Sequence, residues 1–218
     1  MPTESTDCTN CRKPLQLCIC DRVEPVPTAL RIVILQHPQE NDRLLGTAPL
    51  VRLALPNSLV RVGLSWPSLA AALDSENEER ERWAVLAGAK PPGKLPETLL
   101  QKPVVLLDRK GKAMPLGRHG LRGILVLDGT WSQAKTLWWR NPWLLKLPRL
   151  LLRPKEPSMY GRLRRAPRQE WVSTLEAIAE VLPALGEPAA ARENPRRLLR
   201  TLLQRARDHR AEGPAAEA

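Results

Sequence analysis

The sequence lacks phenylalanine altogether and has a single tyrosine, yet it has seven tryptophans among its 218 residues. Leucine and other aliphatic residues must therefore fill most of the core, which leaves tryptophans available for stacking. A chain of this length can bury a substantial core, as one large domain or as a domain with a small appendage.

The sequence also lacks long apolar runs. None approaches the roughly 20 residues that a membrane-spanning helix needs, and the first residues do not form the basic-then-apolar pattern of a signal peptide. We therefore expect a cytoplasmic protein without a membrane partner. In that reducing compartment, cysteines more often bind metal than form disulfides.

Acidic residues are too few to balance the basic ones, and the formal net charge is +11. Such an excess favours a polyanionic partner, nucleic acid ahead of membrane, although a merely solvated basic surface is the alternative. Basic residues cluster in two stretches, 102–122 and 153–171. The second contains Arg162, Arg164 and Arg165, which we predict to contact nucleic-acid phosphates.

The four cysteines all fall within the segment CTNCRKPLQLCIC, as Cys8, Cys11, Cys18 and Cys20. A C-x-x-C pair and a C-x-C pair can each direct two thiolates at one ion, and four thiolates complete a tetrahedral zinc shell without an open position. The spacing therefore predicts one structural zinc. An iron–sulfur cluster and four unligated thiols are the alternatives.

Short runs rich in valine, isoleucine and leucine alternate with helical or turn segments from residue 29 onward. Near-continuous apolar strands are typical of a sheet that is covered on both faces, so the pattern predicts an α/β fold with a mostly parallel sheet and flanking helices. The six predicted strands are residues 29–36, 59–64, 82–88, 103–108, 123–129 and 149–154.

We divide the chain into a zinc-binding segment at 1–28, a main domain at 29–190, and a basic helix with a frayed tail at 191–218. In that helix Asn194 is the predicted N-cap and Pro195 the first helical residue. One apolar stripe is predicted for it, made of Leu198, Leu199, Leu202, Leu203 and Ala206.

The segment ILVLDGTW places a carboxylate, Asp128, at the end of a predicted strand. Thr130 and Gln133 then form a predicted capping box, and the helix should end before Pro142. Open α/β sheets bind ligands at the carboxyl ends of their strands, so Asp128 is a candidate site residue. An aspartate that only caps the turn is the alternative, since aspartate is common in such turns.

Three further interpretations concern the surroundings of this motif. The sequence STLEA predicts a second capped helix, with Ser173 as N-cap and Glu176 returning the capping box. His37, in QHPQE directly after the first strand, is either a substrate-binding residue or a satisfied structural histidine. Trp131 could be a stacking face or core, while Trp138 and Trp139 are assigned to the core.

Taken together, these motifs resemble those of the DTW-domain family of tRNA-uridine aminocarboxypropyltransferases. The family is named for a D-x-T-W motif, here Asp128 to Trp131. The cysteine cluster, the HPQE at 37–40 and the STLEA at 173–177 follow in the family's order and approximate spacing. The resemblance covers roughly residues 8–185.

The resemblance implies a fold related to SPOUT-type RNA methyltransferases, with a knot at the S-adenosylmethionine pocket. It also implies the reaction, in which the 3-amino-3-carboxypropyl group moves from S-adenosylmethionine to N3 of a tRNA uridine, in the variable loop for bacterial members. A methyltransferase of the same fold and a non-catalytic zinc-ribbon RNA-binding protein are the alternatives. The partners would be tRNA and S-adenosylmethionine, with a monomer favoured.

The expected site residues combine this resemblance with the positions of the motifs and of the basic stretch at 153–171. The catalytic residues would be Asp128, Thr130 and Trp131, with Asp128 as general base or as an orienting group. The cofactor pocket would include Leu127, Asp128, Trp131, Ser173, Thr174 and Glu176. The tRNA would meet His37, Glu40, Arg162, Arg164 and Arg165.

Overall fold

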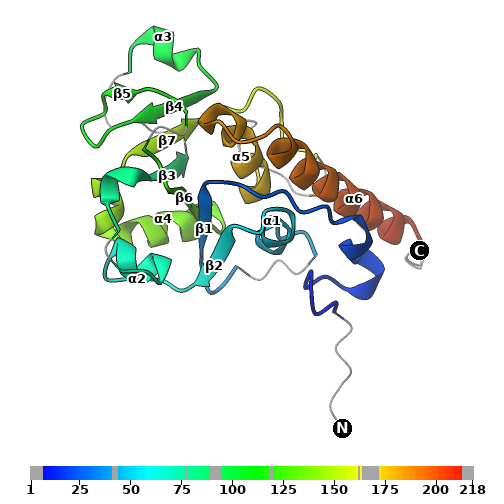
Figure 1. Cartoon of the computed structure of the whole chain (residues 1–218). Coiled ribbons are helices and arrows are strands. Elements are labelled where there is room, and N and C mark those ends of the chain that lie inside the picture. Colours follow the sequence, from blue (N-terminus) through cyan, green and yellow to red (C-terminus); the bar gives the residue numbers. More distant parts are fainter. Residues whose placement is uncertain are drawn as a thin grey trace.

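A computed structural model describes residues 7–40, 44–76, 78–88, 95–117, 120–161, 163 and 172–212. These residues form one sheet flanked by helices (Figure 1). The strands are β1 (Arg31–Gln36), β2 (Ser58–Val62), β3 (Trp83–Gly88), β4 (Val104–Leu107), β5 (Ala113–Met114), β6 (Gly123–Asp128) and β7 (Arg149–Leu152).

The sheet has the strand order β2-β1-β6-β3-β7-β4-β5. The pairs β1·β2, β1·β6, β3·β6 and β3·β7 are parallel, whereas β4 pairs antiparallel with both β7 and β5. The predicted α/β fold with a mostly parallel sheet is confirmed, and so are all six predicted strands. β5 was not predicted, because two exposed residues carry no periodic signal.

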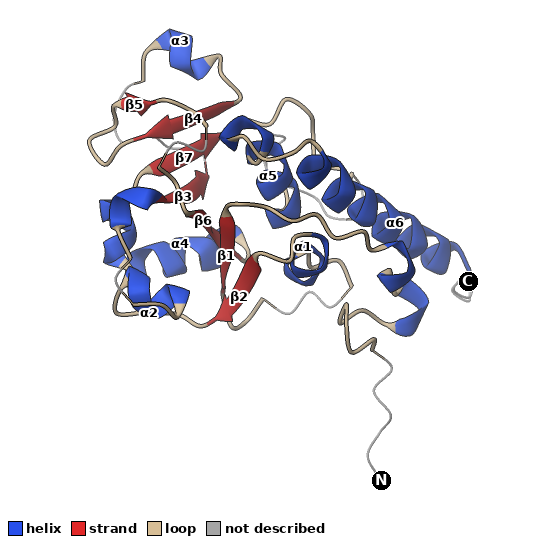
Figure 2. Cartoon of the chain, viewed as in Figure 1, coloured by secondary structure: helices blue, strands red, loops and turns tan. Residues whose placement is uncertain are grey.

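Helices cover both faces of the sheet (Figure 2). They are α1 (Ala48–Ala54), α2 (Leu69–Leu73), α3 (Glu97–Leu100), α4 (Trp131–Arg140), α5 (Thr174–Val181) and α6 (Ala190–Glu212). Five short 3-10 helices complete the described elements: η1 (Leu15–Leu17), η2 (Cys20–Arg22), η3 (Arg80–Arg82), η4 (Pro142–Lys146) and η5 (Pro183–Leu185).

Alternating side chains of the central strands divide the core between the two faces, as the two-residue period of a strand requires. Ile124 and Val126 of β6 pack with α1, α5 and α6. Leu125, between them in sequence, packs on the opposite face with α2, α4 and η4. Both faces of β6 are therefore covered, which explains its continuous apolar sequence.

The predicted start of the C-terminal helix is wrong. α6 begins at Ala190, not after Asn194, and Pro195 lies inside it. Hydrogen bonds from Ala191 N to Pro188 O and from Glu193 N to Ala189 O already form the first turn. Pro195 lies beyond the first turn, where a backbone N–H would bond to the carbonyl four residues earlier. Because proline has no N–H, α6 lacks this one hydrogen bond. The predicted apolar stripe of α6 is buried as expected.

The core assignment of Trp139 is also wrong, since this residue is 71% exposed at the end of α4. Trp138 is partly buried against the α2–α4 side of the core, and the Arg149 guanidinium lies 5.4 Å from the centre of its ring. Leu137, by contrast, is fully buried. Successive helical residues are about 100° apart, so three in a row cannot all face the core.

The N-terminal segment packs against the main body of the protein. Leu17 and Ile19 are buried in the same apolar cluster as Leu199 and Leu202 of α6. Figure 1 shows this segment beside the distal half of α6. The Lys13 ammonium is buried and donates to Gly46 O at 2.6 Å, which ties the segment to the chain between β1 and α1.

Among the described residues, none of the helices, including the 23-residue α6, is long and apolar enough to span a bilayer.

Candidate functional site

Asp128 lies at the carboxyl end of β6, beside the carboxyl end of β1. Gln36 is its register partner in the parallel β1·β6 pair, and the Gln36 side-chain amide donates to Asp128 Oδ2 at 2.6 Å. The His37 N–H continues the ladder by donating to the Asp128 carbonyl at 3.0 Å. Asp128 is 8% exposed, and these contacts hold it at the carboxyl ends of the parallel strands, the edge at which open α/β sheets generally bind ligands.

The other carboxylate oxygen of Asp128 accepts a hydrogen bond from the hydroxyl of Thr174. Thr174 is the first residue of α5, and α4 begins three residues after Asp128. The first turns of two helices thus lie close to this carboxylate. The partial positive charge of helix N-termini stabilises an anion there, whether it belongs to the protein or to a ligand.

Gly129 and the capping box shape the turn that follows Asp128. Gly129 has φ +150°, and a Cβ at this position would lie 2.9 Å from Gln133 Cβ, so only glycine fits. Thr130 Oγ1 accepts from Gln133 N at 3.4 Å, while Gln133 Oε1 accepts from Thr130 N at 2.6 Å. The predicted box is confirmed, and Asp128 is therefore placed at a fixed distance from the start of α4.

Replacing Thr130 with valine is expected to lower the free energy of unfolding by about 1 kcal/mol, because the helix loses its N-cap acceptor. Urea unfolding followed by circular dichroism measures this change. Thr130→Ser keeps the hydroxyl and should retain most of the stability. Equal losses in the two variants would contradict the capping role and indicate that the methyl group of Thr130 matters instead.

His37 and Glu40 form a turn next to Asp128. The His37 ring is buried, and its Nδ1 accepts from Gln39 N at 3.1 Å, which places the proton of the neutral ring on Nε2. Glu40 N donates to His37 O at 2.9 Å. The backbone contact between His37 and Asp128 brings this segment to the site, and a substrate contact of either side chain stays a prediction.

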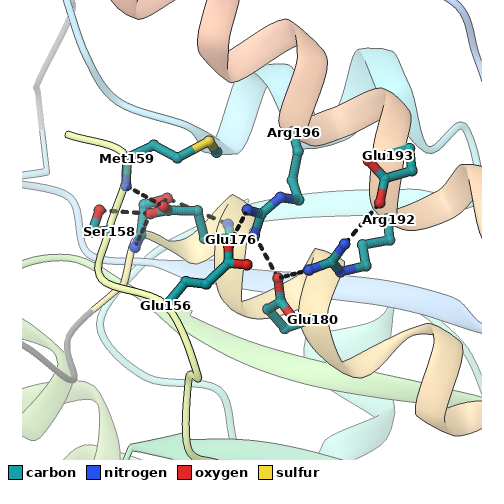
Figure 3. Close-up of polar contacts among 9 residues, drawn as sticks. Glu156, Ser158, Met159, Glu176, Glu180, Arg192, Glu193 and Arg196 are labelled. Carbon is teal, nitrogen blue, oxygen red and sulfur yellow. Dashed lines mark hydrogen bonds and ion pairs between the residues drawn. The ribbon is translucent and has the colours of Figure 1, made fainter.

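Glu176 organises the start of α5. Its carboxylate accepts from Ser173 N and Ser173 Oγ, both at 2.8 Å, which confirms the predicted capping box. It also accepts from Ser158 Oγ at 2.8 Å and Met159 N at 2.7 Å, and Figure 3 shows these two contacts. The buried Glu176 thus joins the chain after β7 to α5. Its predicted cofactor contact is untested.

Two predicted site residues, Trp131 and Leu127, differ in how far their side chains are exposed. Trp131 is 53% exposed at the start of α4, so it is not a core residue and its ring can be reached by a ligand. Leu127 is half-buried and packs against the α2–α4 side of the core. Stacking by Trp131 and a cofactor contact of Leu127 remain predictions.

Three residues of this region were not predicted from the sequence. Gln36 could have been found, because it ends its strand as Asp128 does. Thr47 and Tyr160 carry no motif, yet both are buried: Thr47 Oγ1 accepts from Leu175 N at 3.3 Å, and the Tyr160 hydroxyl donates to Leu45 O. They fasten the chain after β1 to α5 and to the chain after β7.

The four predicted zinc ligands come together. All four sulfurs lie within 4.8 Å of one another, with 3.7 Å between the sulfurs of Cys8 and Cys20 and 3.8 Å between those of Cys11 and Cys18. Four sulfurs bound tetrahedrally at about 2.3 Å from zinc are about 3.8 Å apart, so the donor set fits this metal. The cluster could hold a metal ion.

The thiols of this cluster differ in their acidity. Hydrogen bonds from the backbone of Cys11 and Asn10 lower the pKa of Cys8 to about 6, whereas burial and the neighbouring sulfurs raise the pKa of Cys20 to about 12. Four thiolates this close repel one another strongly, and a dication would offset that repulsion and ionise them together.

The arginines predicted to contact RNA phosphates, Arg162, Arg164 and Arg165, lie outside the described residues, so their role stays a prediction.

Comparison with known proteins shows which family and which relatives this chain is similar to. The DTW domain matches residues 5–207 of the chain. The tRNA-uridine aminocarboxypropyltransferase 2 of Drosophila melanogaster is 30% identical over 93% of this chain and 76% of its own length. The proteins of the same name from Mus musculus and Macaca fascicularis are 28% and 26% identical over 94% and 82% of this chain.

The chain spans 65% of the length of the mouse protein and 56% of the macaque protein. No solved structure matches it. The match over residues 5–207 nevertheless includes the strand-end aspartate, both capping boxes and the four cysteines. On this basis the chain belongs to the DTW-domain family.

Proposed function

We propose that this protein is a tRNA-modifying transferase, which moves the 3-amino-3-carboxypropyl group of S-adenosylmethionine to N3 of a uridine in tRNA. The observation that carries the proposal is the DTW-domain match over nearly the whole chain, together with the similarity to relatives named tRNA-uridine aminocarboxypropyltransferase 2. The variable loop is the proposed location, because a uridine there is already largely unpaired and costs little to extrude.

The transfer forms one bond and breaks another. Uridine N3 loses its proton and attacks the γ carbon of the methionine moiety. The bond between this carbon and sulfur breaks, and the sulfur leaves with the electron pair as 5′-methylthioadenosine. Because the sulfonium activates three carbons, the pocket must position the correct one in line with N3.

The buried carboxylate of Asp128 supports this chemistry. Its two oxygens accept from Gln36 and Thr174, so its position is fixed while its remaining lone pairs can accept a proton or orient a ligand. We assign it the role of general base toward uridine N3 or of an orienting acceptor for the uracil edge or the donor's amino group. Trp131, with its exposed ring, is the proposed stacking face for uracil or adenine.

The proposed cofactor pocket is lined by the carboxyl end of β6 and the N-terminus of α5, with residues that include Leu127, Ser173 and Thr174. Zinc is the proposed metal of the cysteine cluster, and the cytoplasm the proposed location. We also propose that the fold is related to that of SPOUT methyltransferases and that the chain forms a knot at the cofactor pocket. The segment between β7 and α5 includes residues outside the described ones, so the knot stays a proposal.

Incubation of the protein with bulk tRNA and S-adenosylmethionine tests the reaction. Nucleoside mass spectrometry should detect 3-amino-3-carboxypropyluridine, with one 5′-methylthioadenosine released per modified nucleoside. Release of S-adenosylhomocysteine with a methylated nucleoside would instead identify a methyltransferase. Binding of tRNA without any product from S-adenosylmethionine would identify a non-catalytic RNA-binding protein.

A further inference from the structure

α6 is unusually rich in arginine, with seven arginines and three carboxylates in 23 residues. Four of the arginines have carboxylate partners, and Figure 3 shows the ion pairs of two of them, Arg192 and Arg196. The ion pairs are Arg192 with Glu180 and Glu193, Arg196 with Glu180 and Glu156, Arg197 with Glu24, and Arg205 with Asp21.

Arg200 and Arg207 are different, because neither has a carboxylate partner within the described part of the chain. Both side chains are exposed. They are seven residues apart on one helix, so they project from the same side, about 10 Å apart along the axis. Two unneutralised guanidinium groups in a row are suited to a linear polyanion.

These two arginines line a groove of about 510 Å³ between α6 and the chain that follows β7. Met159 is the lining residue from the chain after β7, while Thr201 and Gln204 add polar side chains between the arginines. Leu203 completes the described lining, which therefore combines two cations with uncharged polar and apolar side chains, and none of these described residues is a carboxylate.

A short series of contacts connects the groove with Asp128. Met159 N donates to Glu176, which caps α5 through Ser173. The next residue, Thr174, donates to Asp128. A strand bound in the groove would thus lie against the same loop that fixes the start of α5 at the candidate site.

We infer that the α6 groove, with Arg200 and Arg207, binds the phosphodiester backbone of the tRNA whose uridine is modified. The inference rests on the proposed function, which supplies the tRNA, and it assigns to the C-terminal helix a role in substrate docking. Guanidinium groups form bidentate hydrogen bonds with phosphate oxygens, and Thr201 and Gln204 can donate to the same backbone.

An anionic membrane surface is the competing polyanion, and the packing of α6 argues against it. A helix that lies on a bilayer inserts an apolar face between the lipid headgroups. The apolar stripe of α6 is already used, because Leu198, Leu199, Leu202 and Leu203 are at most 1% exposed in the core. Only its polar side remains for a partner, and there Arg200 and Arg207 offer two guanidinium groups that suit the phosphates of a nucleic-acid strand.

The test is the salt dependence of tRNA binding by the Arg200→Gln/Arg207→Gln variant. Two lost phosphate contacts should reduce the slope of log K against log salt by about 1.4–1.8. If both proteins converge near 1 M salt, affinity at about 0.1 M should fall by roughly 25- to 60-fold. Affinity for S-adenosylmethionine should not change.

The matched control is Arg22→Gln/Arg197→Gln, which removes the same charge from two exposed arginines that pair with Asp21 and Glu24. This control should keep nearly the parental slope. Circular dichroism should show that both variants are folded, since glutamine is a good helix former at exposed positions.

Each other outcome is decisive. If the two double variants weaken binding equally, only net charge matters and the groove assignment is wrong. Unchanged tRNA binding with loss of binding to phosphatidylserine vesicles would assign the groove to a membrane. If the parent binds tRNA through the groove but releases no 5′-methylthioadenosine, only the proposed function is wrong. If the parent transfers normally and the Arg200→Gln/Arg207→Gln variant has the same salt slope as the parent, only the groove assignment is wrong. A parent that does not bind tRNA overturns both.

Discussion

Replacing Asp128 with asparagine is expected to slow single-turnover transfer to tRNA by roughly 10²–10⁴-fold, the range that general-base catalysis supplies. Asparagine has nearly the same shape, and its amide can exchange hydrogen bonds with the side chains of Gln36 and Thr174. The fold and the position of the side chain should therefore be retained. The measurement is formation of 5′-methylthioadenosine with both ligands saturating.

The two roles proposed for Asp128 predict different patterns in this variant. If Asp128 accepts the proton of N3, the rate falls while the affinities for tRNA and S-adenosylmethionine stay near those of the parent. If it orients a ligand, at least one of these affinities weakens as well. Thr130→Val serves as the comparison, because it should lose stability with a smaller effect on rate. Transfer by Asp128→Asn at the parental rate would reduce the carboxylate to a turn residue.

Replacing Cys11 with serine is expected to remove the proposed zinc and unfold the N-terminal segment. Metal analysis should find about one zinc per chain in the parent and almost none in the variant. Binding of a structural zinc is worth about 10–16 kcal/mol in small zinc-binding peptides, so its loss should exceed the effect of any single cap. Cys11 is also fully buried, and a hydroxyl without a partner there adds a desolvation cost.

Thr9→Ala is the matched control, since Thr9 lies in the same knuckle but is exposed. It should keep both the zinc and the melting temperature. A parent that contains iron and absorbs visible light would replace zinc by an iron–sulfur cluster. A metal-free parent whose N-terminal amides are protected from hydrogen exchange would contradict any structural metal.

How far the sequence could predict the fold depends on how local each signal is. Strands β1 and β6 are visible as continuous apolar runs, because both of their faces are covered. The capping boxes at Thr130 and Ser173 are equally visible, since each involves residues only three positions apart. The four cysteines lie within thirteen residues of one another, so their spacing alone is enough to group them as one site.

The contacts that build the site are not local. Asp128 meets Thr174 across 46 residues and Gln36 across 92. No sequence period reveals that β1 and β6 are neighbours or that α5 begins above their ends, because strand order is set by packing of the whole sheet. The exposure of Trp139 was missed for a related reason: an apolar run indicates a core helix, but helical geometry decides which of its members face inward.

The packing of the N-terminal segment on α6 has a consequence for synthesis of the chain. Asp21 and its partner Arg205 are 184 residues apart, so at about 5–20 residues per second the ribosome makes α6 roughly 10–40 s after this segment emerges. Until then Leu17 and Ile19 have no leucines of α6 to pack against. The cysteine ligands need no such wait, because all of them emerge together. A metal ion captured at that stage would hold the nascent knuckle closed, as a template on which α6 later docks.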